Sequence, residues 1–118
     1  LEESVYYSFI DEDCMTIDMV SCGNDNIWEN GRLTQFSIYY APITYLPNNF
    51  GNLHELGELD LINNNIQTLP DNFDQLSNLF QLNLFNNQLQ NFIFNIGELQ
   101  SLEVLNLENN QISARGAE

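Results

Sequence analysis

Apolar residues recur along most of the chain in a regular order that repeats every 23 residues. The repeat is clearest in LHELGELDLINNNIQTLPDNFDQ, LSNLFQLNLFNNQLQNFIFNIGE and LQSLEVLNLENNQISARGAE, which begin at Leu53, Leu76 and Leu99. All three share the frame L-x-x-L-x-x-L-x-L-x-x-N-x-[LI]. The L-x-L portion alternates with the period of a β-strand that has one buried face. The pattern therefore predicts one short strand in each repeat.

A weaker copy of the frame precedes these three, between Leu33 and Phe50, with Ala41 where the asparagine belongs. The frame then covers about residues 28–112, and the chain resembles the leucine-rich repeat (LRR) proteins. This resemblance implies a curved solenoid of the α/β type, with a parallel β-sheet on the concave face and short helical or 3-10 turns on the convex side. We expect turns to start near residues 32, 53, 76 and 99, the last of them incomplete.

The asparagine of the frame stands at the sharp bend that follows each strand. Asn64, Asn87 and Asn110 can donate their side-chain amides to otherwise unpaired backbone carbonyls of their own and the neighbouring turn. Ala41 has no amide to donate. We therefore expect a ladder of asparagine hydrogen bonds and a less regular first turn.

The segments L-P-N-N-F and L-P-D-N-F are expected to form the convex side. Pro70 suits a change from extended chain to a turn, and Asp71 can cap a short helical turn. Phe50, Phe73 and Ile96 recur at one position of the frame. We expect these three side chains to stack inward as a spine.

Residues 1–31 are interpreted as an amino-terminal cap segment, and residues 32–118 as the solenoid. By their spacing, Cys14 and Cys22 form either a small disulfide loop in an oxidising compartment or two buried thiols. The stretches V-S-C and N-G-R-L-T-Q-F-S-I are similar to the cap that opens plant-type extracellular LRR proteins. This second resemblance implies a disulfide between the two cysteines, a covered amino-terminal end of the core, and a secreted or cell-surface eukaryotic protein.

The charge of the chain is strongly negative. Seventeen Asp and Glu face two Arg and no Lys, which gives a formal net charge of −15. Such a surface repels nucleic acid and anionic lipid and cannot supply phosphate contacts. The apolar stretches are only a few residues long, so neither a transmembrane helix nor the core of a signal peptide is encoded. We predict no nucleic-acid partner and no membrane insertion.

The register of the repeat assigns exposed strand positions to columns on the concave face, where LRR proteins usually bind their ligands. One column, Tyr39, Ile62 and Phe85, forms an apolar stripe flanked by amides and carboxylates, a pattern typical of recognition surfaces. Alternatively, these side chains shield the strand edges or pack against their neighbours. The predicted ligand-binding residues are Tyr39, Tyr40, Glu58, Asp60, Ile62, Gln81, Asn83, Phe85 and Asn106.

The sequence contains no catalytic constellation. His54 stands alone on a predicted surface turn, and no Ser or Cys has a base partner in its sequence context. The cysteines and the histidine lack the spacing of zinc ligands. The acidic residues favour a solvated face over loose calcium binding, because no calcium-binding loop is present. We predict a protein that is not an enzyme and that has no metal and no cofactor.

The last repeat is unfinished. Beyond Ile112 the next buried position of the frame falls on Arg115, and the convex spine position is never reached. We expect a partly open core and a strand with a free hydrogen-bonding edge, and we predict an assembly edge at Val104, Leu105, Leu107 and Ile112. The chain is then a segment of a longer LRR protein, or it stacks on another copy, or an unrelated partner docks there.

The favoured function is non-catalytic recognition of a protein or glycan ligand on the concave face, in the extracellular space. The alternative is a structural subunit that stacks head-to-tail on further copies of itself, into an extracellular filament or surface layer, because a contact between unlike ends does not close. In that case the leading segment LEESVYYSFI would act as a donated strand, although it can also pack on its own cap.

Overall fold

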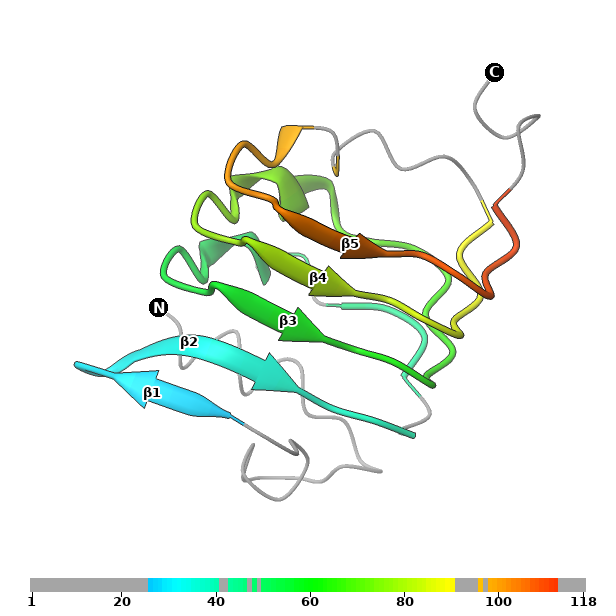
Figure 1. Cartoon of the computed structure of the whole chain (residues 1–118), viewed down its shortest axis with the longest axis horizontal. Helices are drawn as coiled ribbons and strands as arrows, with labels where there is room; N and C mark the ends of the chain where they lie inside the picture. The colour runs from blue at the N-terminus through cyan, green and yellow to red at the C-terminus, as the bar shows by residue number, and fades with distance from the viewer. Residues whose placement is uncertain are drawn as a thin grey trace.

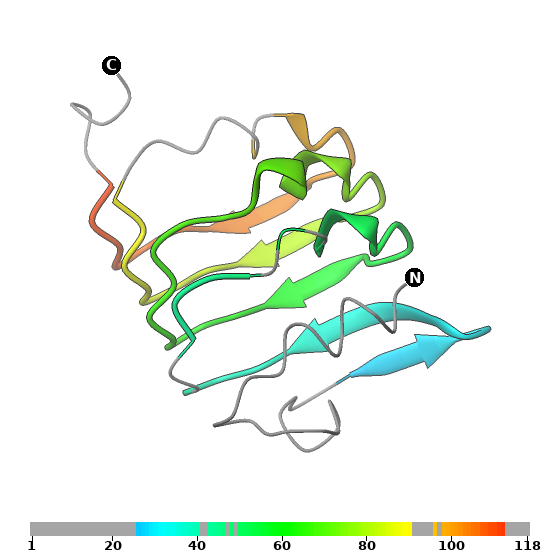
Figure 2. The same ribbon diagram turned by 180° about the vertical axis from the view of Figure 1, so that it is seen from behind.

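The computed structural model describes residues 26–40, 43–46, 48, 50–90, 96 and 98–112. Within these ranges five short strands form one sheet and follow one another in chain order (Figure 1). They are β1 (Ile27–Glu29), β2 (Arg32–Ser37), β3 (Glu58–Asp60), β4 (Gln81–Asn83) and β5 (Val104–Asn106). Two 3-10 turns, η1 (Phe50–Asn52) and η2 (Asp71–Gln75), lie against the opposite side of the sheet, as Figure 2 shows from behind.

Strands β2 to β5 are parallel, and each is displaced from the next by one repeat. Phe36 lies beside Leu59, Leu59 beside Leu82, and Leu82 beside Leu105. Residues at the same position of the frame are therefore neighbours in space. The predicted curved solenoid, with its parallel sheet and short helical turns, is confirmed.

The sheet begins with an antiparallel strand that the repeat pattern does not predict. β1 pairs with β2, with Trp28 opposite Leu33 and Glu29 opposite Arg32. Between the strands Asn30 and Gly31 have φ angles of 54° and 78°. A two-residue hairpin turn of type I′ requires left-handed values at both positions, and Asn-Gly is the pair that adopts them most readily.

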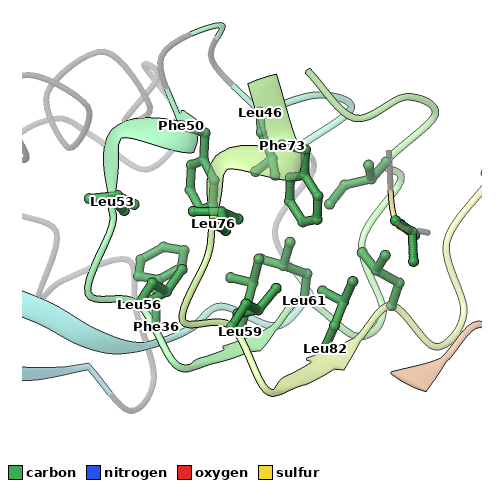
Figure 3. Close-up of a cluster of buried hydrophobic side chains, with 14 of the residues drawn as sticks. Phe36, Leu46, Phe50, Leu53, Leu56, Leu59, Leu61, Phe73, Leu76 and Leu82 are labelled. Carbon is green, nitrogen blue, oxygen red and sulfur yellow. The ribbon is translucent and has the colours of Figure 1, made fainter. Parts of the chain in front are cut away.

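The interior is filled by the apolar residues of the frame. The rings of Phe50 and Phe73 stack with their centroids 6.4 Å apart and an interplanar angle of 10°. The predicted stack is confirmed for Phe50 and Phe73, and Ile96 is buried in the same core. Figure 3 shows both rings projecting from the convex turns toward Leu59 of β3 and Leu61 just after it.

The convex turns differ from the prediction at one cap. Pro70, with φ −69° and ψ 157°, occupies the position before η2, and no side chain caps that turn. The expected cap by Asp71 is wrong because Asp71 is already the first residue of the turn. A different side chain, that of Asn72, connects the two convex turns: its Oδ1 accepts a hydrogen bond from the Gly51 N–H at 3.2 Å.

The asparagine ladder is present. The Nδ2 of Asn87 donates to the carbonyl of Leu84 in its own turn at 3.1 Å and to that of Leu61 in the preceding turn at 2.9 Å. Asn64 and Asn110 make the corresponding pairs of bonds. Each bond to the preceding turn ties two turns together. Ala41, and with it the prediction of a less regular first turn, lies outside the described residues.

Candidate ligand-binding face

The outward-facing strand residues form two columns on the concave face. Register places Gln81 beside Glu58, Asn83 beside Asp60, and Asn106 beside Asn83. These five side chains are half-buried and alternate along the strands with the leucines of the frame. The structure thus brings together the polar residues that the sequence nominates for ligand binding.

The second of these columns also has a structural role. The Oδ1 atoms of Asp60, Asn83 and Asn106 accept hydrogen bonds from the backbone N–H two residues further on, at 3.4, 3.0 and 2.9 Å. This is the Asx turn, in which a short polar side chain folds the chain leaving the strand. One acceptor of each side chain is therefore already engaged within its own turn.

The apolar stripe lies immediately beyond the strands. Tyr39, Ile62 and Phe85 are all half-buried rather than fully exposed. The Tyr39 hydroxyl donates to Oδ2 of Asp60 at 3.3 Å, so its ring reaches across to the next turn. Part of each apolar side chain is thus packed against the protein, and part remains available to a ligand.

Next to the stripe runs a column of residues in the left-handed conformation. Tyr40, Asn63, Asn86 and Asn109 have φ angles of 58°, 60°, 61° and 62°. The three asparagines form a second, exposed amide ladder. Nδ2 of Asn86 donates to Oδ1 of Asn63 at 2.6 Å, and Nδ2 of Asn109 donates to Oδ1 of Asn86 at 2.9 Å. Asparagine tolerates this conformation because its short polar side chain bonds locally.

Tyr40 is the exception in this column. Its side chain is 80% exposed, while its backbone N–H donates to the Asn63 carbonyl at 3.0 Å as the fold requires. A non-glycine residue other than asparagine costs roughly 1–2 kcal/mol in this conformation. Conformational strain of this kind is concentrated at ligand clamps and other functional positions. Among the candidate residues Tyr40 is the one that packing explains least.

Comparison with known proteins decides the family. The sequence model described as "Leucine-rich repeat and WD repeat-containing protein 1, LRR" matches residues 20–116. The chain belongs to the leucine-rich repeat family. The family indicates a protein-binding repeat module, of a kind that is typically non-catalytic.

Two solved structures resemble this LRR chain. An LRR protein of Leptospira interrogans is 36% identical with a TM-score of 0.67, over 71% of this chain and 21% of that protein. The LRR ectodomain of the receptor kinase SOBIR1 from Arabidopsis thaliana is 28% identical with a TM-score of 0.59, over 69% of this chain and 46% of the ectodomain. The LRR chain thus spans less than half the length of either. No curated protein sequence matches it.

The last strand of the LRR chain exposes residues that other turns bury. Leu105 is 42% exposed, whereas its counterparts Leu59 and Leu82 are at most 1% exposed. Val104 beside it is 51% exposed, and β5 lies at the edge of the sheet formed by the described strands. Leu107 and Ile112 are partly buried against the core. Of the four residues predicted as an assembly edge, Val104 and Leu105 are exposed, while Leu107 and Ile112 are only partly so.

Other candidate chemistry is sparse in the described part of the LRR chain. His54 is exposed, and within these ranges no group of three His, Cys, Asp or Glu side chains is placed to hold a metal ion. No helical segment there has the length and apolar character of a bilayer span. Cys14 and Cys22, with the predicted disulfide and cap, lie outside the described residues.

The repeat pattern does not predict one feature of the surface. A cleft of about 330 Å³ opens where the strands begin, between β1 and the segments that lead into β3 and β4. Its wall includes Gly57 and Phe80, which occupy variable positions of the frame. The sequence indicates it only through the size contrast between these two residues, one repeat apart.

Proposed function

We propose that this LRR chain is a non-catalytic recognition module that binds a protein ligand on its concave face, with Tyr40 as a central contact. The observation that carries the proposal is the exposed aromatic ring of Tyr40 in a left-handed position where the three following turns have asparagine. Exposed tyrosines are frequent hot spots of protein interfaces because they bury large area at a low entropic cost.

The surroundings of Tyr40 suit such an interface. The half-buried stripe of Tyr39, Ile62 and Phe85 provides apolar contact, and Glu58 and Asp60 lie beside it. With a net charge of −15, the surface favours a partner that presents basic groups around an apolar centre. The predicted site also includes Gln81, Asn83 and Asn106. A glycan ligand is the less favoured form of this proposal, since LRR modules commonly bind proteins.

The test uses the purified chain as bait in native extracellular fluid, followed by mass spectrometry and an affinity measurement with the purified captured protein. Tyr40→Asn is the informative variant, because it keeps the backbone conformation and removes the ring. Tyr45→Asn is the matched control, since Tyr45 is also largely exposed, at 63%, and does not have a positive φ. We expect Tyr40→Asn to lose the partner and Tyr45→Asn to retain it. Equal affinity of all three chains would refute the proposed site.

We further propose an extracellular location and an amino-terminal cap, residues 1–31, closed by a Cys14–Cys22 disulfide ahead of a solenoid of residues 32–118. The cap-like motifs of the sequence support this, as does the likeness to a receptor ectodomain. Intact mass after iodoacetamide treatment of the chain secreted from eukaryotic cells tests it. Alkylation of both cysteines only after reduction is expected, and alkylation without reductant would contradict the disulfide.

The second candidate function, head-to-tail stacking into a filament or layer, is favoured by the exposure of Leu105 on β5. The occupant of this surface would be another copy of the chain. Light scattering at increasing salt tests it, because salt screens the repulsion between copies of charge −15. Assemblies that grow with salt and dissociate on Ile112→Asp, but not on Tyr45→Asp, are the expected result. A monomer under all conditions would exclude this candidate.

A further inference from the structure

The cleft at the strand starts is lined by both apolar and acidic side chains. Ile27 and Phe80 line it and are 43% and 38% exposed, which is high for large apolar side chains. Three carboxylates, those of Glu29, Glu55 and Glu58, line the same space. The cleft borders the concave face and shares Glu58 with it, whereas Tyr40 lies beyond the opposite ends of the strands and does not line the cleft.

The position of the Phe80 ring depends on the glycine one repeat earlier. A Cβ atom added to Gly57 would lie 2.9 Å from Cε2 of Phe80, closer than real contacts allow. Backbone hydrogen bonds hold both residues in place, from Gly57 N–H to Thr34 O at 2.8 Å and from Phe80 N–H to Gly57 O at 2.9 Å. The ring therefore lies flush against the backbone of the preceding turn while part of it faces the cleft.

Positive charge is scarce near these carboxylates. Glu29 is opposite Arg32 in the β1–β2 hairpin, and both line a neighbouring cleft of about 480 Å³ that Glu55 also borders. Arg32 is one of only two basic residues of the whole chain that carry a permanent positive charge. Arg32 does not line the 330 Å³ cleft, so the three carboxylates of Glu29, Glu55 and Glu58 give that lining an excess of negative charge.

We propose that this cleft binds the guanidinium group of an arginine side chain supplied by a partner polypeptide. A guanidinium is planar, weakly hydrated and always charged, so it stacks on an aromatic ring while its N–H groups reach carboxylates. The exposed Phe80 ring and the Glu55 and Glu58 carboxylates provide both kinds of contact in one cleft. The net charge of −15 draws such a basic segment toward the protein.

The test is a titration of the ¹⁵N-labelled chain with the acetylated, amidated peptide Gly-Gly-Arg-Gly-Gly, followed by amide chemical shifts. The same peptide with citrulline in place of arginine is the matched probe, because citrulline has the shape of arginine without its charge. We expect the arginine peptide, and not the citrulline peptide, to shift the amides of Gly57, Glu58 and Phe80. The shifts should weaken with added salt.

Variants distinguish peptide binding in this cleft from nonspecific electrostatic attraction of the peptide to an acidic protein. Phe80→Leu keeps an apolar side chain and the backbone bonds, and should weaken binding about two- to five-fold through loss of the cation–π contact. Glu55→Gln should weaken it to a similar extent, whereas Glu98→Gln, an exposed carboxylate that does not line the cleft, should have no such effect. Tyr40→Asn should leave peptide binding unchanged.

Three outcomes would overturn the proposal. The first is equal binding of the citrulline peptide, and the second is an effect of Glu98→Gln as large as that of Glu55→Gln. The third is the absence of shifts at Gly57 and Phe80 at the highest soluble peptide concentration. None of these results depends on the identity of the ligand proposed for the concave face.

Discussion

Replacing Tyr40 by asparagine is expected to stabilise the protein. Asparagine populates the left-handed conformation several-fold more readily than tyrosine, which corresponds to a gain of about 1 kcal/mol at φ 58°. The new amide would also join the exposed ladder by accepting a hydrogen bond from Asn63, which adds roughly 0.5 kcal/mol at an exposed site. Against this, the ring of Tyr40 is 80% exposed, so little apolar burial is lost, on the order of 0.5 kcal/mol.

The balance is a net stabilisation of about 1 kcal/mol, or a rise in Tm of about 4–8 °C for a domain near 100 residues. Urea unfolding followed by Trp28 fluorescence measures it, with Tyr45→Asn as the control that removes a tyrosine without relieving a positive φ. The reverse change, Asn63→Tyr, should destabilise, because it creates the strain and interrupts the ladder. A Tyr40→Asn variant no more stable than the wild type, with Asn63→Tyr also neutral, would refute the argument from strain.

Three further predictions concern the repeat framework. Asn87→Ala should lower the free energy of unfolding by about 1–3 kcal/mol, because it leaves the buried Ile66 N–H without its side-chain acceptor and removes one of the two amide donors from each of the Leu61 and Leu84 carbonyls. Urea denaturation measures the loss. Gly51→Ala should be strongly destabilising, because the added Cβ would meet the Asn72 carbonyl oxygen; a melting temperature equal to that of the wild type would contradict the close approach of the two turns. Leu82→Ala should lower the free energy of unfolding by about 2–5 kcal/mol, and Leu105→Ala should lower it clearly less, because Leu105 is 42% exposed. Equal losses in urea denaturation would show that β5 is covered in solution.

Much of the fold follows from the sequence because it is encoded in a single repeat length. When each turn of a solenoid has the same length, a residue and its counterpart 23 positions later become neighbours without any further information. The strand positions, the asparagine ladder at Asn64 and Asn87 and the stack of Phe50 on Phe73 are all of this kind. The β1–β2 hairpin is also encoded locally, in Asn30-Gly31, but it lies outside the 23-residue period, so the repeat pattern does not predict it.

The sequence predicts the candidate site only as columns of outward-facing residues on the concave face. Alternation along a strand shows which side chains face outward, yet it does not show which of their atoms are already bonded. The Asx turns of Asp60 and Asn83, and the bond from the Tyr39 hydroxyl to Asp60, depend on backbone geometry just beyond the strands. The same limitation holds for Tyr40, whose positive φ becomes informative only beside the asparagines of the following turns.

The sequence by itself determined the architecture of this protein, since a repeated apolar frame with one asparagine per turn has essentially one way to bury its leucines. Only the tertiary structure decided what the variable positions of that frame do. The ring of Phe80 lies over Gly57 because parallel stacking places a large residue beside the one residue that has no side chain. Leu105 is exposed because β5 has a described neighbour on one side only. Such contacts depend on pairs of residues in different turns, and no pattern within one turn specifies them.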